Sequence, residues 1–215
     1  MSSIAAVSEP SIRGHLHRPA SPGGDGLVLT HGAGANCDTP LLVALANAIC
    51  DAGITVLRYD LPFRQLRPHG PPPPGSAERD QQGLRAAIAH MRQQTSGCIF
   101  LGGHSYGGRQ SSLLCAAEPG LVDALLLLSY PLHPPRRPDQ LRTAHFAALN
   151  TPALFVHGAR DPFGTVEELA TALELIPART ELLPIPSAGH ELLTEKNCDG
   201  LPKLVADALQ SFAAG

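Results

Sequence analysis

A serine flanked by glycines lies near the middle of the chain, in Gly103-His104-Ser105-Tyr106-Gly107. The spacing matches G-x-S-x-G, a sharp turn that presents a serine hydroxyl as a nucleophile between a strand and a helix. The glycines have a mechanical reason, because only residues without bulk let that helix pack closely on the strand. The pattern alone also occurs by chance, so the residues before and after it must show whether the serine is a nucleophile.

The flanks have the required character. Residues 98–101 form an apolar run of strand length, and residues 110–117 follow with the composition of a helix. A strand, a turn and a helix are the context in which G-x-S-x-G carries a nucleophile. We therefore predict that Ser105 is catalytic, and an idle serine in an ordinary glycine turn is the weaker interpretation.

A serine hydroxyl needs a general base at neutral pH, and the base needs a group that fixes its tautomer. Of the ten histidines, His190 lies between the last expected strand and the last expected helix, after small residues. Asp161 follows an earlier expected strand, which places it at the sheet edge where catalytic groups of open α/β sheets gather. The order Ser105, Asp161, His190 predicts a catalytic triad, and the structural alternative for Asp161 is a turn cap before Pro162.

Acyl transfer also builds negative charge on a carbonyl oxygen, which preorganised backbone N–H groups can stabilise. We predict that the amides of Tyr106 and Ala33 form this oxyanion hole, with Gly34 of the same glycine-rich loop as the alternative to Ala33. The loop contains neither G-x-x-x-x-G-K-[ST] nor G-x-G-x-x-G, which argues against a nucleotide site.

Strand-like and helical segments alternate along the chain, as a parallel sheet wrapped by helices requires. Strands are expected at 26–31, 54–59, 98–102, 122–130, 152–157 and 180–185. Helices are expected from Thr39 and Pro40, from a Ser76 cap, at 107–118, after a Thr165 and Glu168 capping box, and at 201–212. Residues 4–7 and 12–17 suggest an antiparallel edge hairpin. The Pro-rich segment 61–75 is expected to be an extended surface loop. The prediction is an α/β fold of three layers with a mostly parallel central sheet, in a single domain over 1–215.

About twenty residues separate the strands ending at Tyr130 and starting at Pro152, which is too few for a cap domain. We expect an open site covered only by segments 61–75 and 131–150. Because rim loops carry specificity, Gly34, Phe63, His133 and Phe163 are the candidate substrate-binding residues, with the Tyr106 side chain beside them.

The net charge is −3 and the 16 Lys and Arg residues are scattered, so nucleic acid is not an expected partner. No segment resembles a signal peptide or a membrane span. Five cysteines without a CxxC pair predict reduced thiols in the cytoplasm.

His15 and His17 could bind a metal, but no third ligand is visible, so no metal site is expected. Oligomeric state is left open.

With these residues placed, the chain resembles the α/β-hydrolase superfamily, and specifically its small capless Tex30/KANSL3-like, dienelactone-hydrolase-related group. The shared stretches are 30–35, 101–109, 128–134 and 154–158. The sequence predicts a serine hydrolase that cleaves an ester or thioester of a small molecule through an acyl-enzyme, without metal or organic cofactor. The alternatives are a non-catalytic interaction module of the same fold, and another triad chemistry as in peptidases, acyltransferases or perhydrolases.

Overall fold

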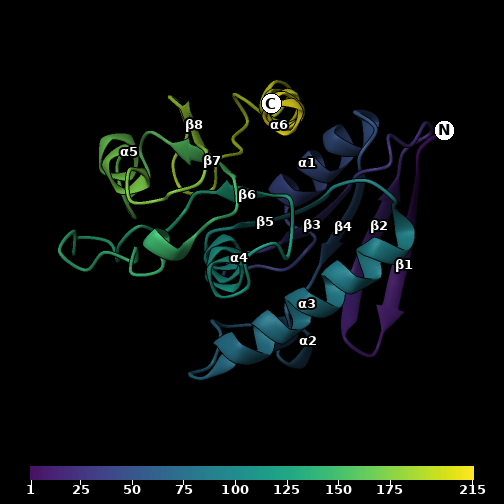
Figure 1. The fold of residues 1–215 in the computed structure, drawn as a ribbon, viewed down its shortest axis with the longest axis horizontal. Helices are drawn as coiled ribbons and strands as arrows, with labels where there is room; N and C mark the ends of the chain where they lie inside the picture. The colour runs from purple at the N-terminus through teal and green to yellow at the C-terminus, as the bar shows by residue number, and fades with distance from the viewer.

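A computed structural model describes residues 1–215, and one eight-stranded sheet runs through its centre (Figure 1). The strand order is β1-β2-β4-β3-β5-β6-β7-β8. The strands are β1 (Ser3–Glu9), β2 (Ile12–Arg18), β3 (Gly26–Thr30), β4 (Thr55–Tyr59), β5 (Ile99–His104), β6 (Ala124–Leu128), β7 (Ala153–Gly158) and β8 (Thr180–Ile185). From β4 to β8 all neighbours are parallel, whereas β2 pairs with β1 and with β4 in antiparallel fashion. This is the mostly parallel sheet that the sequence predicts.

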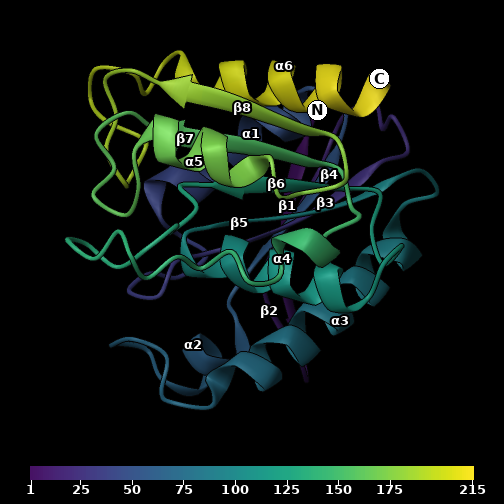
Figure 2. The same ribbon diagram turned by 60° about the vertical axis from the view of Figure 1, so that its left-hand side comes forward.

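Helices cover both faces of the sheet, which gives three layers (Figure 2). The helices are α1 (Pro40–Asp51), α2 (Pro62–Leu66), α3 (Ser76–Gln94), α4 (Tyr106–Ala117), α5 (Val166–Leu173) and α6 (Leu201–Ala214). Helices α1 and α6 bury their apolar sides in one core cluster, and α3, α4 and α5 bury theirs in another. Alternate residues of one strand enter different clusters, as Phe100 and Leu101 of β5 do. Strands covered on both faces read as continuous apolar runs for this reason.

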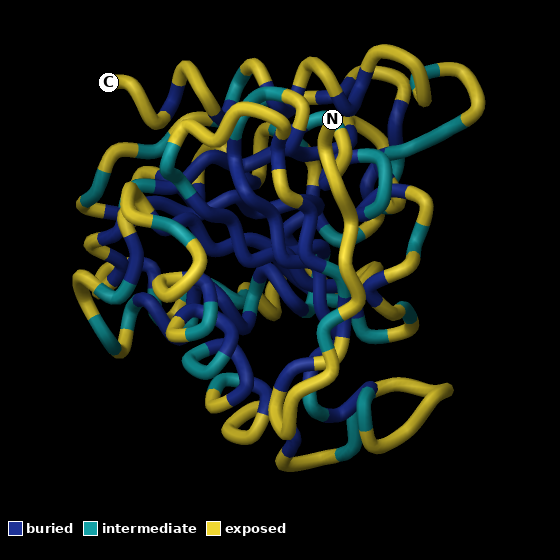
Figure 3. Tube along the Cα trace, turned by 90° about the vertical axis from the view of Figure 1, so that its right-hand side faces the viewer, coloured by how far each residue is buried: buried dark blue, intermediate teal, exposed yellow.

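The first two strands form the expected hairpin, and β1 is the edge of the sheet. Its residues are almost all exposed, so both of its faces meet solvent (Figure 3). By contrast, β2 buries Ile12 and Leu16 because it also pairs with β4. The antiparallel pair therefore extends the parallel sheet on the side away from β8.

The Pro-rich segment differs from the expectation of a purely extended loop. Pro62 begins the short helix α2, because its fixed φ suits a first helical position and its missing N–H would have no partner there. Arg64 of α2 is only 2% exposed. Helix α3 begins at Ser76, but Gly75 takes the cap position and the Ser76 side chain forms no capping hydrogen bond. Thr165 and Glu168 do form the expected capping box on α5.

The connection between β6 and β7 holds one short 3₁₀ helix, Phe146–Ala148, and no separate lid. Its Phe146 packs against Tyr130 and Phe155 in the core cluster to which α3, α4 and α5 also contribute. None of the helices is both long enough and apolar enough to span a bilayer.

Candidate active site

Three side chains from different loops converge at the carboxyl edge of the sheet. Ser105 follows β5, Asp161 follows β7 and His190 follows β8. The Nε2 atom of His190 lies 2.9 Å from Ser105 Oγ, and its Nδ1 atom lies 2.8 Å from Asp161 Oδ2. Because a carboxylate only accepts hydrogen bonds, Nδ1 carries the hydrogen and Nε2 is left to accept from the serine hydroxyl. The three residues are thus arranged to move a proton from hydroxyl to imidazole.

The backbone at Ser105 is held in a conformation that residues other than glycine rarely adopt, with φ 50° and ψ −111°. Such strain persists only where the surroundings enforce it. Here α4 presses on β5 through glycines: a Cβ on Gly103 would lie 2.7 Å from the Gly107 carbonyl carbon, and one on Gly108 would lie 2.6 Å from the Gly103 oxygen. The glycines of the motif therefore have the packing function that the sequence predicts.

Asp161 is fixed by its own hydrogen bonds. Its side chain is fully buried, and its Oδ1 accepts the Phe163 N–H at 2.9 Å. The Phe163 ring lies against the His190 ring, with centroids 4.3 Å apart. The imidazole is therefore held by the carboxylate at one edge and by an aromatic ring on one face.

His104 is a site residue whose role sequence reasoning missed. Its Nε2–H donates to the backbone oxygen of His190 at 2.8 Å, and the two rings lie 5.0 Å apart. Burial lowers the pKa of His104, which favours the neutral ring. His104 thus ties the loop that carries His190 to the turn that carries Ser105. Its position inside the motif was the signal, but the partner lies 86 residues away.

The predicted oxyanion donors have free N–H groups. Ala33 lies in the loop after β3, outside any helix or strand, and its N–H donates to no protein acceptor. Tyr106 is the first residue of α4, where the N–H groups of a helix have no intrahelical partner. Ala33 and Ser105 line the same cavity. Neither amide donates to an acceptor within the protein.

An open cavity of about 580 Å³ lies over Ser105. Its walls come from the loop after β3, the turn at Ser105, and the loops that carry Asp161 and His190. It is lined by Gly32, Ala33, Gly34, Ala35, Thr39, His104, Ser105, Phe163, His190 and Glu191. Two of the candidate substrate-binding residues, Gly34 and Phe163, are therefore in its wall. Segments 61–75 and 131–150, expected to cover the site, contribute no residue to it.

The other candidates for substrate contact lie elsewhere. Phe63 is buried, packed edge-on against the rings of His31 and Tyr106. The Tyr106 hydroxyl donates to Asp80 Oδ2 at 2.8 Å, so this side chain points into the protein toward α3. His133 is also buried, with one ring nitrogen beside the Pro134 oxygen and the other 3.4 Å from Glu168. These contacts correct the prediction, because rim position in the sequence does not say which way a side chain turns.

The loop of Ala33 rests on a neutral histidine. His31 Nε2 accepts the Leu61 N–H at 3.1 Å, which leaves Nδ1–H to donate to the Gly32 oxygen at 2.8 Å. The side chain is fully buried, and that burial lowers the pKa of His31 from 6.5 to about 4.

Stability should therefore fall in mild acid. The unfolded chain binds a proton at His31 near pH 6.5, and the folded protein binds it only near pH 4. Folding is thus penalised as the pH falls through this window, by about 2 kcal/mol between pH 7 and pH 5. Urea unfolding at the two pH values measures the summed change, to which His17 and His145 add in the same direction because burial lowers the pKa of each to about 4. An unfolding free energy that stays constant from pH 7 to pH 5 would contradict the assignment.

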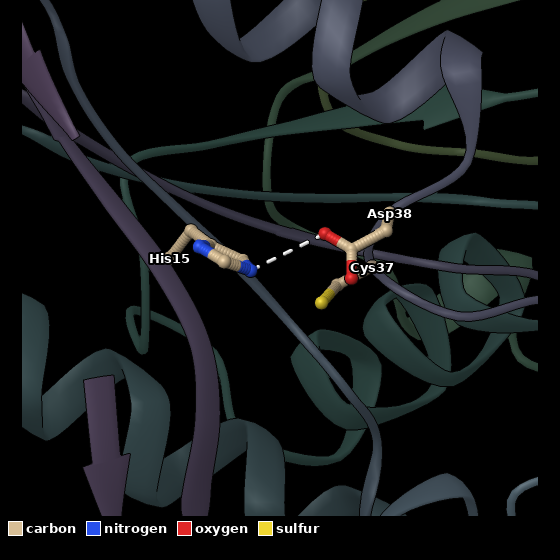
Figure 4. Close-up of side chains that lie close together, drawn as sticks. All are labelled: His15, Cys37 and Asp38. Atoms are coloured by element: carbon tan, nitrogen blue, oxygen red, sulfur yellow. Dashed lines mark ion pairs between the residues drawn. The ribbon is translucent and has the colours of Figure 1, made fainter. Parts of the chain in front are cut away.

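One cluster of metal-ligating groups lies outside the site: His15, Cys37 and Asp38 (Figure 4). His15 Nε2 lies 3.3 Å from Asp38 Oδ1, so the structure supplies neighbours for His15 that the sequence did not reveal. However, the Arg58 guanidinium bonds to the same carboxylate oxygen, and its Nε donates to His17 Nε2 at 2.8 Å. A cation already pairs with this carboxylate, which favours an ion-pair network over a metal centre.

A mostly parallel eight-stranded sheet, with a serine on a strained turn between strand and helix, defines the α/β-hydrolase fold. A family described as an alpha/beta hydrolase domain matches residues 24–213, and the chain belongs to this family. Dienelactone hydrolase from Anabaena variabilis is 24% identical over 98% of both chains, with a TM-score of 0.74. TT1662 from Thermus thermophilus is 18% identical, covers 100% of this chain and 99% of that one, and has a TM-score of 0.77. Est1E from Butyrivibrio proteoclasticus is 17% identical over 100% of both chains, with a TM-score of 0.73. At these identities the solved structures show the shared fold.

Proposed function

We propose that the protein is a serine hydrolase that cleaves an ester or thioester of a small molecule through an acyl-enzyme. The observation that carries the proposal is the continuous hydrogen-bonded chain from Ser105 through His190 to Asp161, at 2.9 and 2.8 Å. That chain is the arrangement by which a serine hydroxyl becomes a nucleophile. The alpha/beta hydrolase family to which the chain belongs agrees with hydrolysis.

In the first half-reaction, Ser105 Oγ attacks the substrate carbonyl carbon while His190 Nε2 takes the hydroxyl proton. The negative charge then rests on the carbonyl oxygen, where the amides of Ala33 and Tyr106 stabilise it. The tetrahedral intermediate collapses as His190 returns the proton to the leaving alcohol or thiol. Water, activated by the same imidazole, hydrolyses the acyl-serine and regenerates Ser105.

The cavity wall supports an uncharged acyl group. Small residues of the loop after β3 form one side of the cavity. Phe163 is the only phenylalanine, tyrosine or tryptophan among the lining residues. Neither Lys nor Arg lines the cavity, and Glu191 adds a carboxylate. Because no cation is there to pair with phosphate or carboxylate, we propose that a neutral small molecule is the substrate.

Covalent labelling tests the proposal. A fluorophosphonate probe should attach to Ser105, which intact-protein and peptide mass spectrometry would locate. A panel of p-nitrophenyl esters, acyl thioesters and peptide amides should then rank esters and thioesters above amides. A folded protein that neither reacts with the probe nor hydrolyses any of these would favour a non-catalytic interaction module. Preferential amide cleavage would favour a peptidase.

We further propose that the chain falls in the Tex30/KANSL3-like group within its family. The stretch 129–134 supports this, because it carries the sequence most particular to that group. Five free cysteines, three of them buried, support a reducing cytoplasm as its location. Phylogenetic placement with full-length relatives, and fractionation of cells that express the protein, would test these two proposals.

A further inference from the structure

We propose that Arg64 is a positioning residue that clamps the oxyanion loop, residues 31–37, into its working shape. This inference rests on the proposed function, since the loop carries one of the two oxyanion donors. Arg64 lies on α2, in the Pro-rich segment, and touches neither the nucleophile nor the base. Its side chain is 2% exposed and forms no ion pair with a carboxylate, so its charge is matched by something else.

Backbone carbonyls take that role. Arg64 Nε donates to the Ala35 oxygen at 2.6 Å, and Nη2 donates to the Ala33 oxygen at 3.0 Å. Nη2 also donates to the Gly70 oxygen at 2.8 Å, and Nη1 donates to the Arg67 oxygen at 3.0 Å. One buried guanidinium thus joins two carbonyls of the oxyanion loop to two carbonyls of the Pro-rich segment.

The direction of these bonds decides where the free N–H groups point. In a trans peptide the C=O and N–H of one unit point in opposite directions. The Ala33 carbonyl faces Arg64, so the Gly34 N–H faces away from it. The Gly32 carbonyl accepts from His31 Nδ1 and from the Ala35 N–H, so the Ala33 N–H faces away from those groups. Two successive amides are thereby left free.

The far end of the loop is held by the same stretch of chain. Asp60 Oδ1 accepts the Cys37 N–H at 2.8 Å, and Asp60 Oδ2 pairs with Arg13. Arg13 in turn donates to the Arg64 backbone oxygen at 3.2 Å. Residues 60–64 therefore contact the loop at its start, middle and end. Held in this way, the loop does not have to reorganise when negative charge appears.

Arginine suits this position better than lysine. Its planar fork offers five N–H donors that stay charged, whereas a lysine ammonium offers three donors around one point. Four carbonyl partners spread over Ala33, Ala35, Arg67 and Gly70 need the wider reach. A lysine here would keep the buried charge but lose contact with part of the set.

The test compares Arg64→Lys with Arg67→Lys. Arg67 is an exposed arginine three residues away that contacts Arg64 only through its backbone oxygen, and its side chain makes no hydrogen bond, so changing that side chain is a matched control. Amide hydrogen exchange reports on the clamp without any substrate. In Arg64→Lys, the Ala35 and Cys37 amides should exchange on the order of tenfold faster, because their local opening becomes easier. In Arg67→Lys they should exchange as in the wild type.

Steady-state kinetics on the best ester of the panel then connects the clamp with catalysis. We expect kcat to fall about tenfold to a hundredfold in Arg64→Lys, with KM within about threefold of wild type, because the loop acts on the transition state. Arg64→Gln, which removes the buried charge, serves as a second variant if the lysine variant does not fold.

Each outcome bears on the proposal. Unchanged exchange and unchanged kcat in folded Arg64 variants would overturn it, and so would a rise in KM with kcat preserved. Faster exchange in a protein whose wild type turns over no acyl substrate would uphold the clamp and refute the hydrolase proposal instead. Melting temperature, recorded for each variant, separates loss of the loop from loss of the fold.

Discussion

Replacing Ser105 by alanine is expected to lower turnover of the best ester about a millionfold, the loss seen where a triad is fully engaged. The hydroxyl is the atom that forms the acyl bond, and no other nucleophile lies against His190 Nε2. Substrate binding should persist, because the cavity wall is otherwise intact. The variant should also fail to react with a fluorophosphonate. Single-turnover and steady-state kinetics measure the effect, with mass spectrometry for the adduct.

The matched control is Ser211→Ala, an exposed serine on α6 that does not line the cavity over Ser105. It should retain wild-type turnover and wild-type labelling. Ser105→Ala should also retain the melting temperature within a few degrees, since Ser105 forms its side-chain hydrogen bond only with His190. A Ser105→Ala protein with undiminished turnover would remove Ser105 from the mechanism.

Replacing Asp161 by asparagine is expected to lower kcat about ten-thousandfold. The carboxylate at 2.8 Å requires a hydrogen on Nδ1 of His190, which leaves Nε2 free to take the serine proton. An amide can present its NH₂ to Nδ1 and so favours the opposite tautomer, whose Nε2 already carries a hydrogen. Loss of the negative charge also removes support for the imidazolium that forms during attack. The amide oxygen can still accept the Phe163 N–H, so the loop should keep its shape.

This second variant has its own control in Asp207→Asn, an exposed carboxylate that pairs with Lys203 on α6. Surface pairs of this kind contribute little, so kcat should not change. The kinetics should be measured beside the rate of fluorophosphonate labelling, which depends on the same proton transfer. If Asp161→Asn lowered kcat less than about tenfold, another residue would have to orient the base.

The features that the sequence predicted correctly depend on residues close together in the chain, or on the rules by which parallel strands are arranged. Strand and helix segments were predictable because burial on two faces imposes continuous apolar runs, and burial on one face of a helix imposes a helical period. The capping box of Thr165 and Glu168 could be predicted because both residues lie within one helical turn. The meeting of Ser105, Asp161 and His190 could be predicted because the loops that carry them leave the carboxyl ends of parallel strands.

The misjudged features depend on contacts between distant residues. Phe63 and His133 lie in segments that reach the rim, yet packing turns both side chains inward. The burial of Arg64 could not be inferred from a Pro-rich stretch, because two of its carbonyl partners lie about thirty positions earlier in the loop after β3.

The chain's residue pattern by itself determined the alternation of strands and helices, the glycine-flanked turn at Ser105, and the order in which Asp161 and His190 follow it at the sheet edge. Such features are local, or they follow from the rule that parallel strands end at one edge. Tertiary structure alone decided which residues line the cavity, that His104 bonds to the loop of His190, and that the buried guanidinium of Arg64 bonds to the loop of Ala33. These are hydrogen bonds and packing contacts between segments far apart in the chain. Neither the periodicity of a segment nor the spacing of its residues indicates which distant residue it contacts.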